Sequence, residues 1–337
     1  MSNNHPFRDE SGSDFWGGHT QAAPPAVTGT VEDVERALTI PDPAPAAPKS
    51  GLAGWWSRMF GPKAPPVSPQ QQQLNDWVEL IRTPTHNHRI TVSCHKGGVG
   101  KTTTTLALGT VMAMYRPDQI VAIDANPDVG TLSNQLPGRK VHKRTARDLT
   151  ANADQIATSQ DVRQFTHVSP DRMEVLASDS DPEKARSFDA ADYDLTQKVL
   201  GTYRDIVITD TGTDMTHGVF EEIINYTDTL VVAASNAVED ARLAGHTLNT
   251  WATRGVKNRG AALVPNAVVA IHRKPEGTVV TDDRLREVFE ARVRRVVFIP
   301  NDPYLTRGGV FEWNALAPAT QRAYIELAAA VGEGFRR

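Results

Sequence analysis

The stretch that decides the fold is His95-Lys96-Gly97-Gly98-Val99-Gly100-Lys101-Thr102-Thr103, which follows a short apolar run and precedes a helical pattern. Its three glycines allow the backbone to curl with the N–H groups pointing inward, and the helix that starts near Lys101 adds a positive N-terminal end. Such a loop binds phosphates, because Lys101 reaches the β- and γ-phosphates and Thr102 offers its hydroxyl to Mg²⁺. The stretch therefore predicts a site for ATP or ADP with Mg²⁺.

The loop departs from the common form of this motif at its first position. The pattern G-x-x-x-x-G-K-[ST] wants glycine where this chain has His95. A second lysine, Lys96, precedes the paired glycines instead. A flexible cation there cannot easily fold onto the contents of its own loop, but it is well placed to reach the phosphates of another subunit. The sequence therefore favours a homodimer that forms with ATP.

Two apolar runs, 121–124 and 206–210, end in the carboxylates Asp124 and Asp210. The carboxyl ends of parallel strands meet at the ligand crevice of a sheet, so both carboxylates are expected beside the loop. We take Thr102, Asp124 and Asp210 as the candidate Mg²⁺ ligands, with Asp210 acting through a water molecule.

Outward from the loop, short β-branched strands alternate with helices. Little polar alternation within the strands indicates a mainly parallel sheet that is covered on both faces. The expected fold class is a doubly wound α/β P-loop fold. The expected strands are 89–94, 119–124, 173–177, 205–209, 229–234, 268–271 and 294–299, and the expected helices are 102–114, 190–200, 219–225, 238–253, 282–291 and 319–335.

The first 73 residues are predicted to be a disordered, proline-rich tail. Half of the 22 prolines lie between Pro6 and Pro69, and Gln70 to Gln73 add a polar run. Such a segment buries too little apolar surface to offset its chain entropy. One short amphipathic segment, 50–61, contains Trp55 and Trp56 beside basic residues, which suits the chain's own globular domain, a partner groove or a membrane surface. The globular domain is expected to span 74–337.

Composition restricts the class of protein further. The formal net charge of −4 gives no global reason to expect nucleic-acid binding, and the single cysteine, Cys94, excludes an internal disulfide. We find no secretory signal and no apolar run long enough to span a bilayer. These features favour a cytoplasmic protein, with recruitment to the inner face of the membrane left open.

The run Lys96 to Thr103 resembles the deviant Walker A motif of the MinD/ParA family. The resemblance implies an ATPase that forms a nucleotide sandwich dimer and hydrolyses ATP slowly, with Lys96 acting across the dimer. It places switch I at 124–127 and switch II at 210–212. It also implies an adenine pocket lined by the late segment Phe298 to Asp302. The candidate catalytic residues are Lys96, Lys101, Asp124 and Asn126, and the candidate nucleotide-binding residues are Lys96, Gly97, Gly98, Val99, Gly100, Lys101, Thr102, Thr103, Asp210, Pro300, Asn301 and Asp302.

A narrower resemblance covers most of the chain. The order Gly54-Trp55-Trp56, a short helix, the loop, and then Asp124-Ala125-Asn126-Pro127-Asp128 is similar to the EspI-like ATPases of type VII (ESX) secretion loci, which also carry a proline-rich N-terminal extension. This resemblance implies an accessory ATPase that meets a secretion-machinery protein through its tail. Actinobacterial conjugative elements could carry the same architecture.

Two positions depart from the family pattern. Where ParA proteins have a second switch I aspartate that orients the attacking water, this chain has Asn126, and an amide is a far poorer proton acceptor. Hydrolysis is therefore expected to be slow or partner-dependent, with Asp128 as a substitute carboxylate. Where relatives often place an adenine-reading asparagine, this chain has His272, which we interpret as a surface histidine at a strand end.

Basic runs keep a second class of function open. Clustered cations can contact the phosphates of DNA, as they do in ParA-type partition ATPases, although most charge runs are simply solvated. The alternatives to the secretion ATPase are therefore a DNA partition ATPase and a nucleotide sensor with little turnover. The basic residues concerned are Arg139, Lys140, Lys143, Arg144 and Arg147 in one run, and Arg292, Arg294 and Arg295 in the other.

Overall fold

The computed structural model describes residues 68–126, 130, 132–137, 144–216, 218–275 and 279–335. The predicted tail, including the tryptophan segment 50–61, therefore lies almost wholly outside the described residues. Three other features predicted from the sequence lie outside them as well. They are Pro127 of switch I, the substitute carboxylate Asp128, and the first part of the basic run, with Arg139, Lys140 and Lys143.

The described residues form one eight-stranded sheet in the order β3-β4-β2-β5-β1-β6-β7-β8. All neighbouring strands are parallel except β3 and β4, which pair antiparallel. The strands are β1 (His88–Ser93), β2 (Ile120–Ala125), β3 (His167–Val168), β4 (Glu174–Leu176), β5 (Ile206–Thr211), β6 (Thr229–Ser235), β7 (Val268–His272) and β8 (Arg295–Ile299). Strand β1, which feeds the glycine loop, lies near the centre of the sheet.

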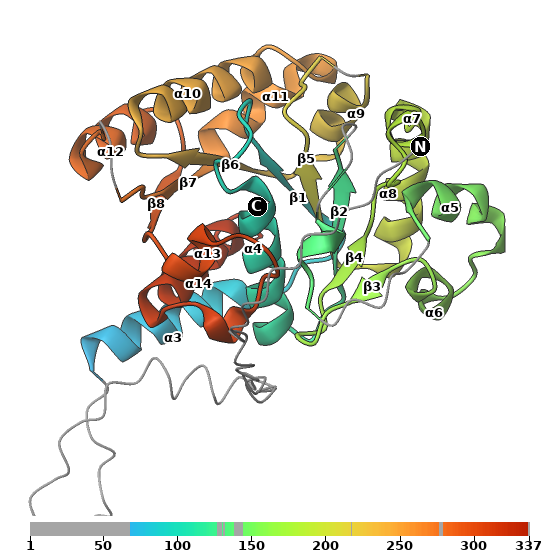
Figure 1. Cartoon of the computed structure of the whole chain (residues 1–337), viewed down its shortest axis with the longest axis horizontal. Coiled ribbons are helices and arrows are strands. Elements are labelled where there is room, and N and C mark those ends of the chain that lie inside the picture. Colours follow the sequence, from blue (N-terminus) through green and yellow to red (C-terminus); the bar gives the residue numbers. More distant parts are fainter. Residues whose placement is uncertain are drawn as a thin grey trace, which may run out of the picture.

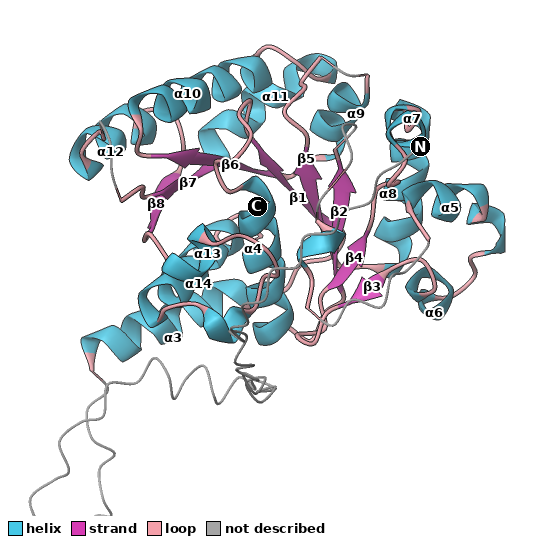
Figure 2. Ribbon diagram, in the orientation of Figure 1, coloured by secondary structure: helices cyan, strands magenta, loops and turns pink. Residues whose placement is uncertain are grey.

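Helices cover both faces of this sheet (Figures 1 and 2). Helices α3, α4, α13 and α14 lie along one face, and α9 to α12 lie along the other. A third apolar cluster joins β2, β4 and β5 to α5, α6 and α8 at the β3 end of the sheet. The helices are α3 (Pro69–Ile81), α4 (Lys101–Tyr115), α5 (Ala146–Ala151), α6 (Ser159–Arg163), α7 (Pro182–Arg186), α8 (Ala190–Tyr203), α9 (Val219–Tyr226), α10 (Val238–Ala252), α11 (Arg259–Leu263), α12 (Asp282–Glu290), α13 (Pro303–Thr306) and α14 (Pro318–Gly332).

The predicted fold class is confirmed, and each predicted strand and helix is present within a few residues of its predicted ends. Every residue of β2, β5 and β6 is buried, which explains why their sequences lack polar alternation. The short helices α5 and α6 were not predicted. Each is polar and begins with a capping box, so caps rather than an apolar stripe define it.

The polar run that we assigned to the tail belongs to helix α3 instead. Ser68 caps the helix by accepting the N–H of Gln71 at 3.2 Å, and Pro69 occupies its first turn. Residues Gln70 to Gln73 therefore begin a helix whose buried side lies further along, at Leu74, Val78 and Ile81. Assigning these glutamines to a disordered tail was wrong, because a good cap and proline at the first position outweigh the lack of apolar residues.

Helix α14 is the last element of the fold. Its apolar side chains Tyr324, Leu327, Ala328 and Val331 are fully buried, and the helix packs on α3, α4 and β8. This face therefore belongs to the core. Across the described ranges, no helix combines the length and the apolar character needed to cross a membrane.

Candidate functional site

The glycine loop lies between the end of β1 and the start of α4, at the carboxyl edge of the sheet. Helix α4 has no side-chain cap, and its N-cap residue is Gly100. The N–H groups of its first turn are therefore available to an anion, and the helix dipole favours negative charge there. Val99 is buried and fixes the loop to the core, whereas Gly97 and Gly98 are exposed.

Two of the three loop glycines have backbone angles that favour glycine. Gly98 has φ +74° and Gly100 has φ +94°, both in the left-handed region, whereas Gly97 does not have positive φ. A Cβ atom at Gly100 would also lie 2.8 Å from the His272 ring. Gly100 is therefore required twice, for its backbone angle and for its close contact with β7.

His272 ends strand β7, as expected, but it is half-buried under the loop and does not lie on an open surface. Its Nε2 atom is 2.9 Å from the Thr104 hydroxyl in α4. Burial lowers the pKa of His272 to about 4, so the ring is neutral at pH 7. The ring supports the loop from below and lines the same cleft as Gly98 to Thr103.

This cleft, about 390 Å³ in volume, runs from the loop to the segment after β8. Pro300, Asn301 and Asp302 line its far side. Asp302 caps α13 through the Tyr304 N–H at 2.9 Å and accepts the Ala317 N–H at 2.9 Å. Both oxygens of Asp302 thus hold the backbone, so of these three residues Asn301 offers the more available polar side chain.

Lys101 and Thr102 face the carboxyl ends of β2 and β5. The Lys101 ammonium donates to the Lys96 carbonyl at 2.8 Å, and the Thr102 hydroxyl donates to Asp210 at 2.7 Å. Burial lowers the pKa of Lys101, and the nearby charge of Asp210 opposes that shift. The loop lysine and threonine therefore already point to the place where phosphates and a cation would bind.

Asp124 and Asp210 are register partners on the adjacent strands β2 and β5. Burial raises the pKa of Asp124 to about 6, although the N–H groups of Leu132 and Asn126 donate to its carboxylate. Burial and the charge of Asp124 raise the pKa of Asp210 to about 7. Two buried carboxylates with little compensating charge are the arrangement that a bound cation stabilises.

One further observation shows that these residues fit Mg²⁺. Asp210 is only 4% exposed, and its Oδ1 atom has no hydrogen-bond partner. Its other oxygen accepts the Thr102 hydroxyl. A hard cation with oxygen ligands would satisfy the unpartnered oxygen and the charge of both carboxylates. Such a cation, when bound, would neutralise charge on the phosphates of the nucleotide.

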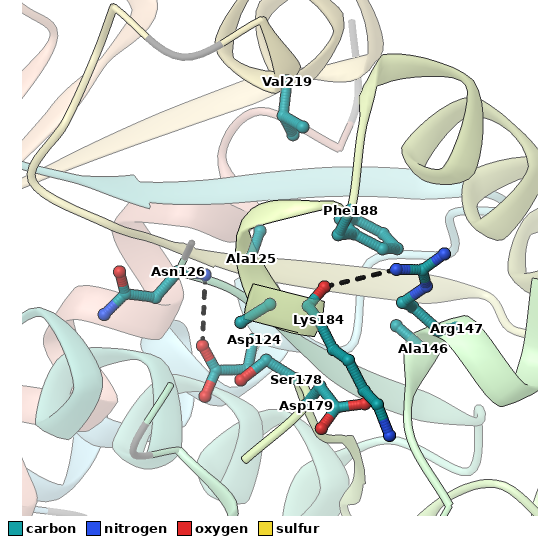
Figure 3. A pocket seen from close by; sticks show the side chains of 11 residues that line it. Asp124, Ala125, Asn126, Ala146, Arg147, Ser178, Asp179, Lys184, Phe188 and Val219 are labelled. Carbon is teal, nitrogen blue, oxygen red and sulfur yellow. Dashed lines mark hydrogen bonds between the residues drawn. The ribbon is translucent and has the colours of Figure 1, made fainter. Parts of the chain in front are cut away.

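Asn126 follows β2 directly and lies at the edge of a second, smaller pocket (Figure 3). Its backbone N–H donates to Asp124 at 3.2 Å. The Phe188 ring and Arg147 line the same pocket. Arg147 donates to the Lys184 carbonyl at 3.5 Å. Asn126, in the segment expected to be switch I, thus lies between the carboxylate pair and a largely apolar pocket lined by α5 and α7.

Lys96 lies on the opposite side of the loop from the carboxylate pair and forms an ion pair with Asp240 of α10. Asp240 also accepts Lys274 at 2.7 Å and the Ser235 hydroxyl at 2.5 Å. His95, which replaces the usual glycine, binds Thr250 of α10 at 2.9 Å. The start of the loop is therefore attached to α10.

Sequence reasoning missed several of these contacts. Asp240 stands in the first turn of α10 like any helix-start acid, and Lys274 follows β7 in a basic run. Gly130 was not singled out either, although a Cβ atom there would meet the Asp124 carboxylate at about 2 Å. No local pattern distinguishes these residues, because their contacts depend on how the chain folds around the loop and not on their immediate sequence.

The described arginines of the two basic runs make contacts within the chain. Arg295 pairs with Glu333 at 2.7 Å, and Arg292 donates to Asn249 at 2.7 Å. Arg144 lies over the ring of Phe165. These side chains therefore serve separate intramolecular contacts.

A glycine loop between a central parallel strand and a helix, with two carboxylates on neighbouring strands, defines a nucleotide-binding protein of the P-loop α/β class. The chain belongs to the family described as "CobQ/CobB/MinD/ParA nucleotide binding domain", whose model matches residues 90–305.

Among curated proteins, the chain is 30% identical over 276 residues to the ESX-1 secretion-associated protein EspI of Mycobacterium tuberculosis, in two strains. The match covers 80% of this chain but only 40% of the relative, so the chain spans about two fifths of that protein's length.

Solved structures share the fold at low identity. A ParA family ATPase from Chlorobium tepidum TLS gives a TM-score of 0.60 at 17% identity, covering 72% of this chain and 98% of that one. The septum site-determining protein MinD of Pyrococcus horikoshii OT3, complexed with Mg-ADP, gives a TM-score of 0.57 at 18% identity, covering 72% and 94%.

Proposed function

We propose that the protein is an ATPase switch that dimerises when it binds ATP and that serves a type VII secretion machine. The observation that carries the proposal is the placement of two lysines on opposite sides of one loop. Lys101 is buried and faces the carboxylates Asp124 and Asp210. The Lys96 side chain is 39% exposed and pairs with Asp240 of α10 instead. A single nucleotide site needs only the first of these lysines.

The roles that we assign follow from these positions. The N–H groups of the loop and Lys101 bind the phosphates, and Thr102 and Asp210 hold Mg²⁺, with Asp124 beside them. Lys96 reaches the phosphates of the partner subunit. Pro300 and Asn301 contact the base at the far end of the cleft. Electrostatic stabilisation of the transferring phosphoryl group accounts for most of the catalysis in this chemistry.

Dimerisation has a kinetic signature that tests the proposal. If two subunits must associate to hydrolyse ATP, the specific activity rises with protein concentration until the dimer is saturated. Lys96→Ala is expected to abolish that rise while retaining ATP binding. A specific activity that is independent of concentration in the wild type, with equal activity in Lys96→Ala, would show a monomeric enzyme.

Asn126 favours a second candidate, a nucleotide sensor with little turnover. Its amide cannot accept a proton as a carboxylate does. In this form of the proposal, ATP controls assembly, and hydrolysis awaits a partner protein. Single-turnover measurements separate the two, because a sensor retains bound ATP over hours whereas an ATPase converts it to ADP.

The role in secretion rests on the similarity to a protein described as ESX-1 secretion-associated. We propose that the segment 50–61 attaches the switch to a component of the machine. Replacing the chromosomal gene with a Lys101→Ala version tests this role. The expected result is a loss of type VII substrates from the culture medium, and unchanged secretion would contradict it. DNA partition is the alternative; of the basic residues, Arg144, Arg292 and Arg295 make separate intramolecular contacts on the surface.

A further inference from the structure

One buried carboxylate, Asp240, holds two lysines that belong to the nucleotide cleft and its loop. The Asp240 side chain is 1% exposed, whereas those of Lys96 and Lys274 are 39% and 43% exposed. Lys274 lines the cleft and Lys96 begins the loop. Lys96 and Lys274 are thus both paired with Asp240, which is not one of the residues that we expect to bind phosphate.

The charge state of Asp240 is fixed. Burial alone would raise its pKa, but hydrogen bonds from Lys274, Lys96 and Ser235 outweigh it and hold the pKa at about 2. The ion pair with Asp240 in turn raises the pKa of Lys96. The contact is therefore an ion pair at neutral pH.

Asp240 keeps partners if Lys96 leaves. Lys274 remains at 2.7 Å and the Ser235 hydroxyl at 2.5 Å. Breaking a buried ion pair is costly when it leaves a charge uncompensated. Here the second lysine prevents that, so Lys96 can move away while Asp240 stays paired.

The Lys96 backbone also contacts the Lys101 ammonium, which a bound nucleotide would attract. The Lys101 ammonium donates to the Lys96 carbonyl at 2.8 Å. Phosphates in the loop attract that ammonium, which removes the donor from the Lys96 carbonyl. Nucleotide binding and the freedom of Lys96 are therefore coupled through one hydrogen bond.

We propose that Asp240 is a positioning residue that keeps Lys96 within its own subunit in the resting protein, and that ATP-driven dimerisation transfers Lys96 from Asp240 to the partner's phosphates while Lys274 stays on Asp240. This inference rests on the proposed dimerising function. It predicts opposite effects for substitution of Asp240 and for substitution of Lys274, the second lysine on Asp240. Removing Asp240 frees Lys96, whereas removing Lys274 leaves Lys96 as the remaining cation on Asp240.

The test compares dimer dissociation constants by sedimentation at saturating ATPγS, so that differences in nucleotide affinity do not enter. Asp240→Asn is expected to dimerise about fivefold more tightly than the wild type, as expected for the loss of one partly exposed ion pair. Lys274→Met is expected to dimerise more weakly by a similar factor. Circular dichroism confirms that each variant is folded, and the Lys274→Met result stands alone if Asp240→Asn does not fold.

A second readout separates positioning from general structure. Acetylation of the Lys96 amine by a limiting reagent, followed by mass spectrometry, is expected to be several-fold faster in Asp240→Asn without nucleotide, because the ion pair no longer protects the amine. Unchanged dimer constants and unchanged acetylation, or shifts of the same sign in both variants, would overturn the inference. A wild type that stays monomeric with ATPγS would instead refute the dimerising function itself.

Discussion

Replacing Asp210 by asparagine should stabilise the nucleotide-free protein while it destroys the cation site. The folded state raises the pKa of Asp210 from its ordinary value of 3.8 to about 7. That difference of about 3 pH units corresponds to about 4 kcal/mol, at about 1.4 kcal/mol per unit. The figure is an upper bound, because charging a buried group draws in water.

The sign of the effect follows from proton binding. A carboxyl whose pKa is higher in the folded state binds protons more tightly there than when unfolded. Its stabilising contribution is complete below pH 3.8 and is lost as the pH rises through 7. At pH 8, the wild type therefore carries the full cost of the buried charge, and Asp210→Asn does not. His272 acts in the opposite direction below pH 6.5, but it is present in both proteins and cancels in their difference.

The assay is thermal unfolding in EDTA between pH 5 and 8, with exposed Asp283→Asn as the matched control. The gap between Asp210→Asn and the wild type should widen with pH, to a melting temperature on the order of 10 °C higher at pH 8. In buffer without EDTA, saturating Mg-ATP should stabilise the wild type by about 3 kcal/mol at 100 times its dissociation constant and should leave the variant unchanged. Melting curves that remain parallel across this pH range would refute the account of the carboxylate pair.

Other substitutions test the loop, the scaffold and switch I. Gly100→Ala places a Cβ at positive φ and against the β7 histidine; it should cost about 2 kcal/mol in urea unfolding and weaken ATP binding at least about tenfold, so wild-type affinity would contradict the loop geometry. Glu174→Ala removes the carboxylate that lies 2.7 Å from the buried Arg204 guanidinium and compensates its charge. The free energy of unfolding should fall by about 3–5 kcal/mol, without a change in the ATP affinity of the folded protein. The exposed acid Glu239 provides the control, because its removal should cost less than about 1 kcal/mol. Asn126→Asp should raise single-turnover hydrolysis about tenfold or more; an equal or lower rate would exclude the amide as the cause of slow turnover.

The fold was largely predictable because its strands are short, β-branched and buried. Strands β1, β2 and β5 begin and end within two residues of their predicted limits, and each polar ending marks the carboxyl edge of the sheet. Asp124 and Asp210 could be placed together for the same reason. Because β2 and β5 are parallel neighbours, their ends lie side by side and bring Asp124 and Asp210 together.

Contacts that depend on three-dimensional packing could not be predicted in this way. His272 looks like a strand-end histidine in sequence, and only the pairing of β7 with β6 brings it under Gly100. Asp240 is one of two acids in a helical first turn, and its contact with Lys96 spans 144 residues. The first turn of helix α3 was assigned to the tail because it is polar on every side. Propensity and periodicity describe neighbours in sequence, whereas these contacts join distant segments.

The central claim is that Lys96 makes the loop part of a nucleotide sandwich between two subunits. Size-exclusion chromatography with light scattering, on the full chain with ADP, ATPγS or no nucleotide, tests it most directly. We expect the mass of a dimer only with ATPγS, and the mass of a monomer for Lys96→Ala in all three conditions. One constant mass for the wild type in every condition, or an ATPγS dimer that survives Lys96→Ala, would contradict it.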